Sequence, residues 1–165
     1  MATLTKLESK LAEVLGLAMA SQEAADTVSD LLEDDEHPLV AELATMREEA
    51  RETQKRLTEL AGSFDRKKTA ILAAAKETKG EAVEMMETYL EGEDEALDGF
   101  EFLTMAEAGE VGHWMVVVAM NERAKHPEVG KLADWALPIQ RRHLQTALDA
   151  AVTLAGDEDP DEPED

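Results

Sequence analysis

The sequence predicts an all-α protein, a bundle of helical hairpins, and three observations favour this fold class. Strong helix formers dominate the chain, and long runs of β-branched residues are few. Of the 165 residues, 44% are hydrophobic but only 4% are aromatic, so Leu, Val, Ala and Met must make up most of the core. Apolar residues also recur at alternating steps of three and four, which is the spacing of one helix face. The length fits a single domain.

The first predicted helix runs from about Thr3 to Leu32, before the acidic break EDDEHP. Its apolar stripe comprises Leu4, Leu7, Leu11, Val14, Ala18, Ala25, Val28 and Leu32. The second helix begins at Pro38, because proline is tolerated in the first turn of a helix. Its stripe comprises Leu39, Leu43, Met46, Ala50, Thr53, Leu57 and Leu60. The segment GSFD ends it, with Ser63 or Asp65 as candidate caps.

Three further helices complete the predicted domain, residues 1–155. A less regular segment from about Arg66 to Leu90 is followed by helices from about Glu95 to Ala124 and from Pro127 to about Ala155. Pro138 falls inside the last helix and predicts a kink or a local irregularity there. The tail GDEDPDEPED, residues 156–165, has no apolar side chain to bury and is predicted to be disordered.

An internal repeat indicates how these helices are connected. The second helix opens with HPLVAELA and the fifth with HPEVGKLA, and both read His-Pro-x-Val-x-x-Leu-Ala. Each follows a long helix after a short break. We therefore expect two similar hairpins, first helix with second and fourth with fifth, joined by the third segment as a long crossover. His37 and His126, which precede the two prolines, are interpreted as turn residues.

The composition narrows the classes of partner. The chain has 38 acidic and 16 basic residues and a formal net charge of -22. This charge argues against nucleic acid and anionic membranes, which both require basic patches. There is no cysteine, so disulfides and thiolate chemistry are excluded. The start MATLTKLESKLAEVLGLAMA lacks the pattern of a signal peptide, and the run MVVVAM is too short to span a bilayer. A cytoplasmic protein is predicted.

The stretch EVGHW places Glu110 and His113 within the most apolar part of the chain. The three-four register predicts an inward face of the fourth helix with both residues at its centre: Gly99, Leu103, Ala106, Glu110, His113, Val117, Met120 and Ala124. The fifth helix places Gln140 and His143 at the centre of a similar face: Val129, Ala133, Ala136, Gln140, His143, Ala147, Ala150 and Leu154. Its many alanines leave room for something larger than side chains.

These polar residues are predicted to meet. If the hairpin turns near His126, both pairs lie about 20–25 Å from the turn, at about 1.5 Å per residue. The second helix offers Glu49 at a similar depth, while the first offers only Ser21 and Gln22. A buried carboxylate is costly unless it is paired or bound to a cation. The sequence therefore predicts a metal site at Glu49, Glu110, His113, Gln140 and His143. Nitrogen and carboxylate ligands without thiolate suit iron, manganese or zinc.

Other interpretations of these residues stay open. A metal-free buried polar network could fix the helix register, and a different register or a haem held between His113 and His143 would also account for the pattern. Trp114 and Trp135 are predicted at the edges of their apolar faces, as core or subunit-contact residues. The sequence contains no glycine-rich phosphate loop and no nucleophile elbow.

The chain resembles the ferritin-like superfamily in its paired hairpins, its long connection and the motif Glu-x-x-His at Glu110 and His113. It is most similar to the small bacterial stress-associated proteins of the YciE/YciF type. The similar features are the length, the context REEARETQKRL around Glu49 and the context MAEAGEVGHWMVV around His113. The resemblance implies a ferritin-like four-helix bundle over residues 1–155, a metal-binding role in stress response or iron handling, and a homodimer.

The chain departs from the metal site of that superfamily. Ferritin-like di-iron and di-manganese proteins supply one Glu from each of two helices and Glu-x-x-His from each of the other two. Here Gln140 stands where Glu is expected, and the second helix has Glu49 and Glu52 but no His after its opening turn. A single ion is therefore more plausible than a dinuclear centre, and oxygen activation is not expected. Whether the protein is an enzyme stays open, and the alternative function is a non-enzymatic interaction or stress protein.

Overall fold

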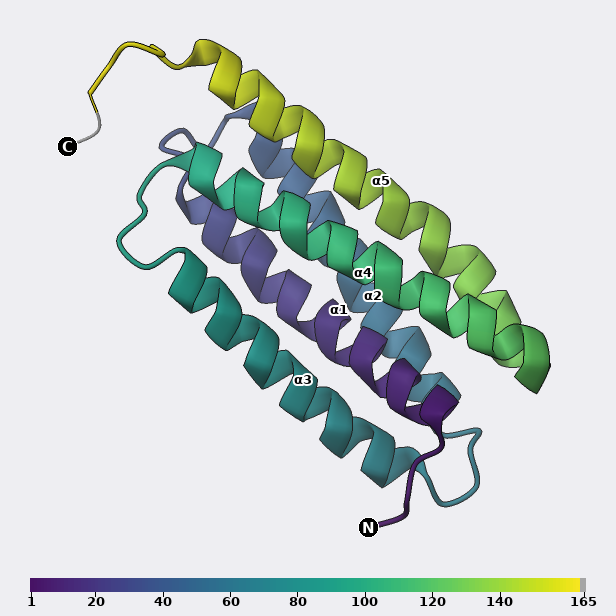
Figure 1. The fold of residues 1–165 in the computed structure, drawn as a ribbon. Helices are drawn as coiled ribbons and strands as arrows, with labels where there is room; N and C mark the ends of the chain where they lie inside the picture. Colours follow the sequence, from purple (N-terminus) through teal and green to yellow (C-terminus); the bar gives the residue numbers. More distant parts are fainter. Residues whose placement is uncertain (164–165) are drawn as a thin grey trace.

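Helices make up most of the computed structural model, which describes residues 1–163 (Figure 1). In chain order they are α1 (Lys6–Asp30), α2 (Pro38–Ala61), α3 (Lys68–Tyr89), α4 (Ala96–Ala124) and α5 (Pro127–Asp157). The described residues contain no β-strand. The prediction of an all-α protein is therefore confirmed, and no predicted helix is missing.

Successive helices run in alternating directions, because a short loop joins each to the next (Figure 1). α1 packs on α2 and α4, and α5 packs on α4 and α2, so these four helices surround a common core. α3 lies mainly against α1, at one edge of the molecule in Figure 1. It carries the chain back from the end of the first hairpin to the start of the second.

The helix starts show why the boundaries fall where they do. Thr5 precedes α1 with an extended backbone, and its hydroxyl accepts a hydrogen bond from the Glu8 amide at 3.2 Å. The Glu8 carboxylate accepts one from the Thr5 amide at 2.7 Å, which completes a capping box. His37 caps α2, with Nδ1 accepting from the Leu39 amide at 3.2 Å, and His126 precedes α5. The interpretation of both histidines as turn residues is confirmed.

Several predictions near helix ends need correction. Neither Ser63 nor Asp65 caps α3, since Lys67 is the residue before it and no side chain caps this helix. α5 continues through Pro138 and ends at Asp157, two residues beyond the predicted end, and the kink at Pro138 stays a prediction. The disorder predicted for residues 156–165 is wrong for Gly156 and Asp157, which belong to α5; for residues 158–163 it stays a prediction, and 164 and 165 lie outside the described part of the chain. In residues 1–163, no helix combines the length and hydrophobicity needed to cross a membrane.

The core is divided into two apolar clusters at opposite ends of the bundle. One contains Leu15, Leu57, Trp114 and Val129, and the other contains Val28, Leu43, Phe100 and Ala147. Each fully buried large aliphatic or aromatic side chain stabilises the fold by about 1.5–3 kcal/mol. Between the clusters, halfway along α4 and α5, lies a group of buried polar residues, here called the polar layer: Glu107, Glu110, Gln140 and His143.

Candidate functional site

The buried face of α4 differs from the predicted face at two positions. Glu107 is buried in place of Ala106, and Trp114 in place of His113. The buried residues of α4 are Gly99, Phe100, Phe102, Leu103, Glu107, Glu110, Trp114 and Val117. Ala106 and Glu107 lie three and four residues after Leu103, so either could continue its face. Ala106 was chosen because alanine is hydrophobic, and that choice was wrong. Trp114 decides the register, because it is the largest side chain of this stretch and is only 1% exposed. Trp114 is therefore a core residue, which was one of its two predicted roles, but its predicted place at the edge of the apolar face is wrong.

His113 does not lie in the polar layer. Its side chain is 41% exposed, and Nδ1 is 3.2 Å from Oε2 of Glu13 on α1. The prediction that His113 occupies the inward face of α4 is therefore wrong, because the rotation that buries Trp114 turns His113 toward α1. His143 lies elsewhere, between α2 and α4 partners, so the structure does not bring the two histidines together around a shared haem.

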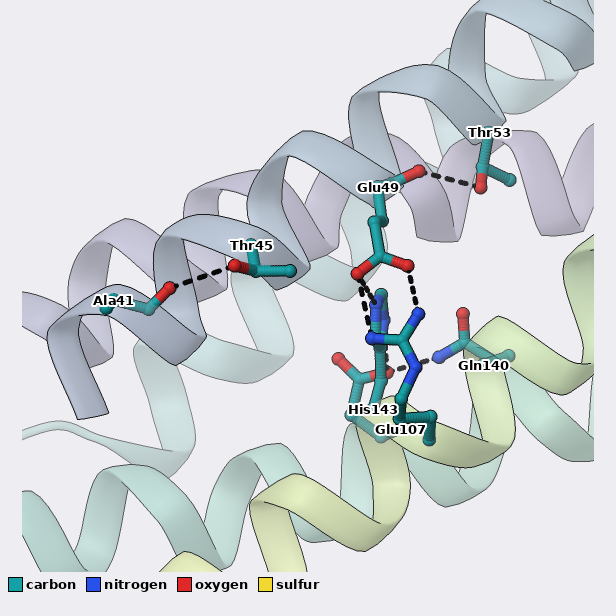
Figure 2. Close-up of polar contacts among 8 residues, drawn as sticks. Ala41, Thr45, Glu49, Thr53, Glu107, Gln140 and His143 are labelled. Atoms are coloured by element: carbon teal, nitrogen blue, oxygen red, sulfur yellow. Dashed lines mark hydrogen bonds and ion pairs between the residues drawn. The ribbon is translucent and has the colours of Figure 1, made fainter. Parts of the chain in front are cut away.

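Glu107 takes the central place that the prediction gave to other residues. It is 2% exposed, and its Oε2 accepts a hydrogen bond from Nε2 of Gln140, which is 6% exposed (Figure 2). Nδ1 of His143 is 3.7 Å from the same carboxylate oxygen. Glu107, Gln140 and His143 therefore form the centre of the polar layer, where α4 faces α5.

Glu49 of α2 lies on the opposite side of the His143 imidazole from Glu107. Its Oε1 is 3.8 Å from Nε2 of His143, and that nitrogen has no hydrogen-bond partner (Figure 2). Arg142 donates two hydrogen bonds to the Glu49 carboxylate, one of them at 2.9 Å. This hydrogen bonding by Arg142 is the main reason why the pKa of Glu49 is lowered. Burial acts in the opposite direction and raises the pKa, while attraction to His143 lowers it further.

Glu110 lies one turn after Glu107, and it is 5% exposed. Burial raises the pKa of Glu110 well above the usual range, and the negative charge of Glu107 raises it further. A hydrogen bond with Ser21 of α1 opposes the shift. No Lys or Arg is buried among residues 1–163. The two carboxylates of α4 therefore share an environment that disfavours two negative charges.

The side chains as they stand do not surround an ion. Within residues 1–163, no three His, Asp or Glu groups are placed so that they could hold a metal. The imidazole explains why, because Glu107 lies on its Nδ1 side and Glu49 on its Nε2 side. Two ligands about 2.1 Å from one ion are separated by about 3.0–3.4 Å at the usual angles. The 3.7 Å between Glu107 and Nδ1 is therefore slightly too wide for a shared ion.

Of the five predicted ligands, His143 lies near Glu49, and both His143 and Gln140 contact Glu107. Glu110 is buried and is influenced by Glu107. Glu107 was missed. One signal in the sequence could have found it. Glu107 follows Leu103 by four residues, Glu110 follows Glu107 by three, and Trp114 follows Glu110 by four, so all of them share one helix face. The metal site itself stays a prediction.

Comparisons with protein-family models, with curated proteins and with solved structures find no match for this chain. The resemblance to ferritin-like proteins therefore stays a prediction from the sequence.

Proposed function

We propose that the chain is a metal-binding helical bundle of the ferritin-like kind, which holds one divalent ion, iron, manganese or zinc, in the polar layer. Nδ1 of His143 and the Glu107 carboxylate are the ligands, and Gln140 supplies an amide oxygen once its amide turns over. Glu110 adds a second negative charge beside the ion. This ligand set leaves out His113, which the sequence pattern favoured, and it keeps Glu49 in a supporting position.

One observation supports this proposal above the others. Glu107 and Glu110 are 2% and 5% exposed, and the described residues contain no buried Lys or Arg to balance them. Burying an uncompensated carboxylate costs several kcal/mol. A divalent ion next to a neutral imidazole would balance both charges at once. Side-chain movement of less than about 1 Å would bring Glu107 and Nδ1 to ligand spacing.

The second nitrogen of His143 fits the same arrangement. An imidazole that binds a metal through one nitrogen usually donates a hydrogen bond from the other to a carboxylate or carbonyl. Nε2 is buried, has no partner and faces Glu49 at 3.8 Å. Arg142 holds the Glu49 carboxylate in place from the solvent side. Glu49 would therefore orient the ligand rather than bind the ion.

A second function is favoured by a different observation. The raised pKa of Glu110 means that a proton can neutralise one of the two carboxylates, and Gln140 already satisfies the other. The polar layer would then be a metal-free network, in a non-enzymatic interaction or stress protein that acts through its surface. This alternative keeps the hydrogen bond between Gln140 and Glu107 as it stands, and it leaves Nε2 of His143 without a partner.

Metal uptake separates the two functions. Purified protein is freed of metal, incubated without oxygen with Fe(II), Mn(II) or Zn(II), desalted and analysed for its elements. We expect about one ion per chain, and a rise in Tm of roughly 5–10 °C when the free ion exceeds its Kd about a hundredfold. His143→Ala and Glu107→Gln should lose the ion. His113→Ala is the matched control, because it removes an imidazole that lies outside the layer, and it should bind metal normally.

Either of two results would overturn the proposal. Wild-type protein that takes up none of the three ions supports the metal-free network. Loss of metal in His113→Ala, with normal uptake in His143→Ala and Glu107→Gln, would place the ion elsewhere. Glu107→Gln nearly preserves shape, so it keeps the test informative if His143→Ala does not fold.

A further inference from the structure

A cavity of about 210 Å³ lies between α1, α3 and α4, beside the polar layer. Its walls are mainly small or apolar, with Ala20 and Ala24 from α1, Ala82 and Val83 from α3, and Ala106 from α4. It is large for a gap between packed helices, because interiors leave few voids bigger than a water molecule. An engineered apolar cavity of about 150 Å³ in another protein binds benzene. This cavity is therefore large enough for an aromatic ring and a short side chain.

Exposed side chains of α3 and α4 mark the mouth of the cavity. Met85 and Met105 line the cavity and are 62% and 48% exposed, so they mark its opening to solvent. Gly109 also lines it, and a Cβ added there would have no heavy atom within 4 Å. Exposed methionines adapt readily to apolar ligands of different shape. Small molecules can therefore reach the cavity without unfolding of the bundle.

The deep end of the cavity is acidic. Glu107 and Glu110 both line it, and each is more than nine-tenths buried. At its rim is His113, whose imidazole is already paired with Glu13 of α1. No Lys or Arg is among the described residues that line the cavity. The cavity is thus apolar along its walls and negative at its end, within a chain of net charge -22.

We propose that this cavity binds a small organic cation, an ammonium group on an apolar body the size of a phenyl ring, with the ammonium at the Glu110 carboxyl. The apolar body would contact the alanine and valine walls and displace water from them. The ammonium would donate hydrogen bonds to Glu110 and offset the negative charge of Glu107. A negatively charged ligand would meet two carboxylates and no cation, so it should be rejected.

This inference does not depend on the proposed metal, and it is tested on full-length protein kept free of metal with a chelator. The probes are 2-phenylethylamine, benzylamine and hexylamine, with 2-phenylethanol as the neutral counterpart and phenylacetate as the anionic one. Binding is measured by calorimetry and by chemical-shift changes of the methionine methyl groups. We expect at least tenfold tighter binding of 2-phenylethylamine than of 2-phenylethanol, shifts at Met85, Met86 and Met105, and no binding of phenylacetate.

Two variants of one helix locate the ligand. Gly109→Leu extends a side chain over the cavity and should weaken amine binding at least tenfold. Gly112→Leu is the matched control, because Gly112 has equally open space on the same helix but does not line the cavity. Both changes replace a helical glycine by a better helix former, so neither should impair folding. Glu110→Gln should remove the preference for the amine over the alcohol.

Three results would overturn the proposal. They are no binding of any of the three amines, equal or tighter binding of the alcohol or the acid, and equal effects of Gly109→Leu and Gly112→Leu. Failure of metal uptake would leave the amine result unaffected. Conversely, failure of amine binding would leave the metal test with His143→Ala intact, so the two proposals can fail separately.

Discussion

Replacing Glu110 by Gln should stabilise the metal-free protein at neutral pH. The carboxyl of Glu110 is 5% exposed, and burial followed by the charge of Glu107 raises its pKa well above the ordinary value of 4.5. The folded protein therefore holds this proton over a pH range in which the unfolded chain releases it. A glutamine of similar shape removes the conflict between the two carboxylates and keeps a group that can hydrogen-bond Ser21 and Glu107.

The sign and size of the effect follow from proton linkage. Below the unfolded pKa of Glu110 the group is protonated in both states, so wild type and variant should differ little. As pH rises above that value, the unfolded chain ionises first, and wild type loses stability relative to the variant by up to about 1.4 kcal/mol per pH unit. The difference stops growing once pH passes the raised folded pKa. At pH 7 we expect a gain of about 1–3 kcal/mol, or roughly 3–10 °C in Tm.

Urea denaturation between pH 4 and pH 8, in the presence of a chelator, measures this difference directly. Glu77→Gln is the control, because it makes the same charge change at an exposed position of α3. Its stability should differ from wild type by a small amount that does not grow over the same pH interval. If the unfolding free energies of Glu110→Gln and wild type differ by the same amount at all pH values, or the variant is less stable at pH 7, then Glu110 does not carry the raised pKa.

Three further predictions concern packing, capping and ligand geometry. Gly16→Ala should destabilise the fold by about 1–3 kcal/mol, because its Cβ would overlap the backbone oxygen of Ala75 on α3. Gly112→Ala, in open space, should instead stabilise the fold by about 0.5–1 kcal/mol. Equal unfolding midpoints in urea for the two variants would contradict this close approach. Thr5→Ala should cost about 1 kcal/mol through loss of the α1 cap, and an unchanged midpoint would show that the capping box contributes nothing. Glu49→Gln should weaken metal binding about 10–100-fold in a competition titration, whereas Glu107→Gln should abolish it, and the reverse order would make Glu49 the direct ligand.

The order and approximate bounds of the helices could be predicted because several signals agreed. The His-Pro repeat marked the starts of α2 and α5, and both histidines stand at helix starts in the structure. The predicted face of α5 is also correct for most of its length, including Gln140 and His143. The alanines, Gln140 and His143 of this face are separated along the chain by charged and other exposed residues. Only one choice of face was therefore consistent with the sequence.

The site on α4 could not be predicted with the same precision. Apolar residues lie on nearly every side of this helix, so two faces fit the three-four spacing equally well. Met115 and Val116 are hydrophobic but 50% and 39% exposed, while Glu107 is buried. The tertiary packing of Trp114 decided which of the two faces is buried, and the size of this side chain was the one local sign of the correct face. The error moved the expected ligand from Glu107 to His113.

The polar layer also has a structural role that is separate from either proposed function. The face of α5 that meets α4 is formed largely by alanines such as Ala136 and Ala147, whose uniform shape gives little resistance to sliding. A shift of one helical turn, about 5.4 Å, would bury Glu107 without Gln140 as its partner. The hydrogen bond between them therefore favours one register over its neighbours. Since this applies with or without an ion, loss of stability in a Glu107 variant cannot by itself identify a metal site. Metal uptake in protein that still folds is the observation that distinguishes a ligand from a register-fixing residue.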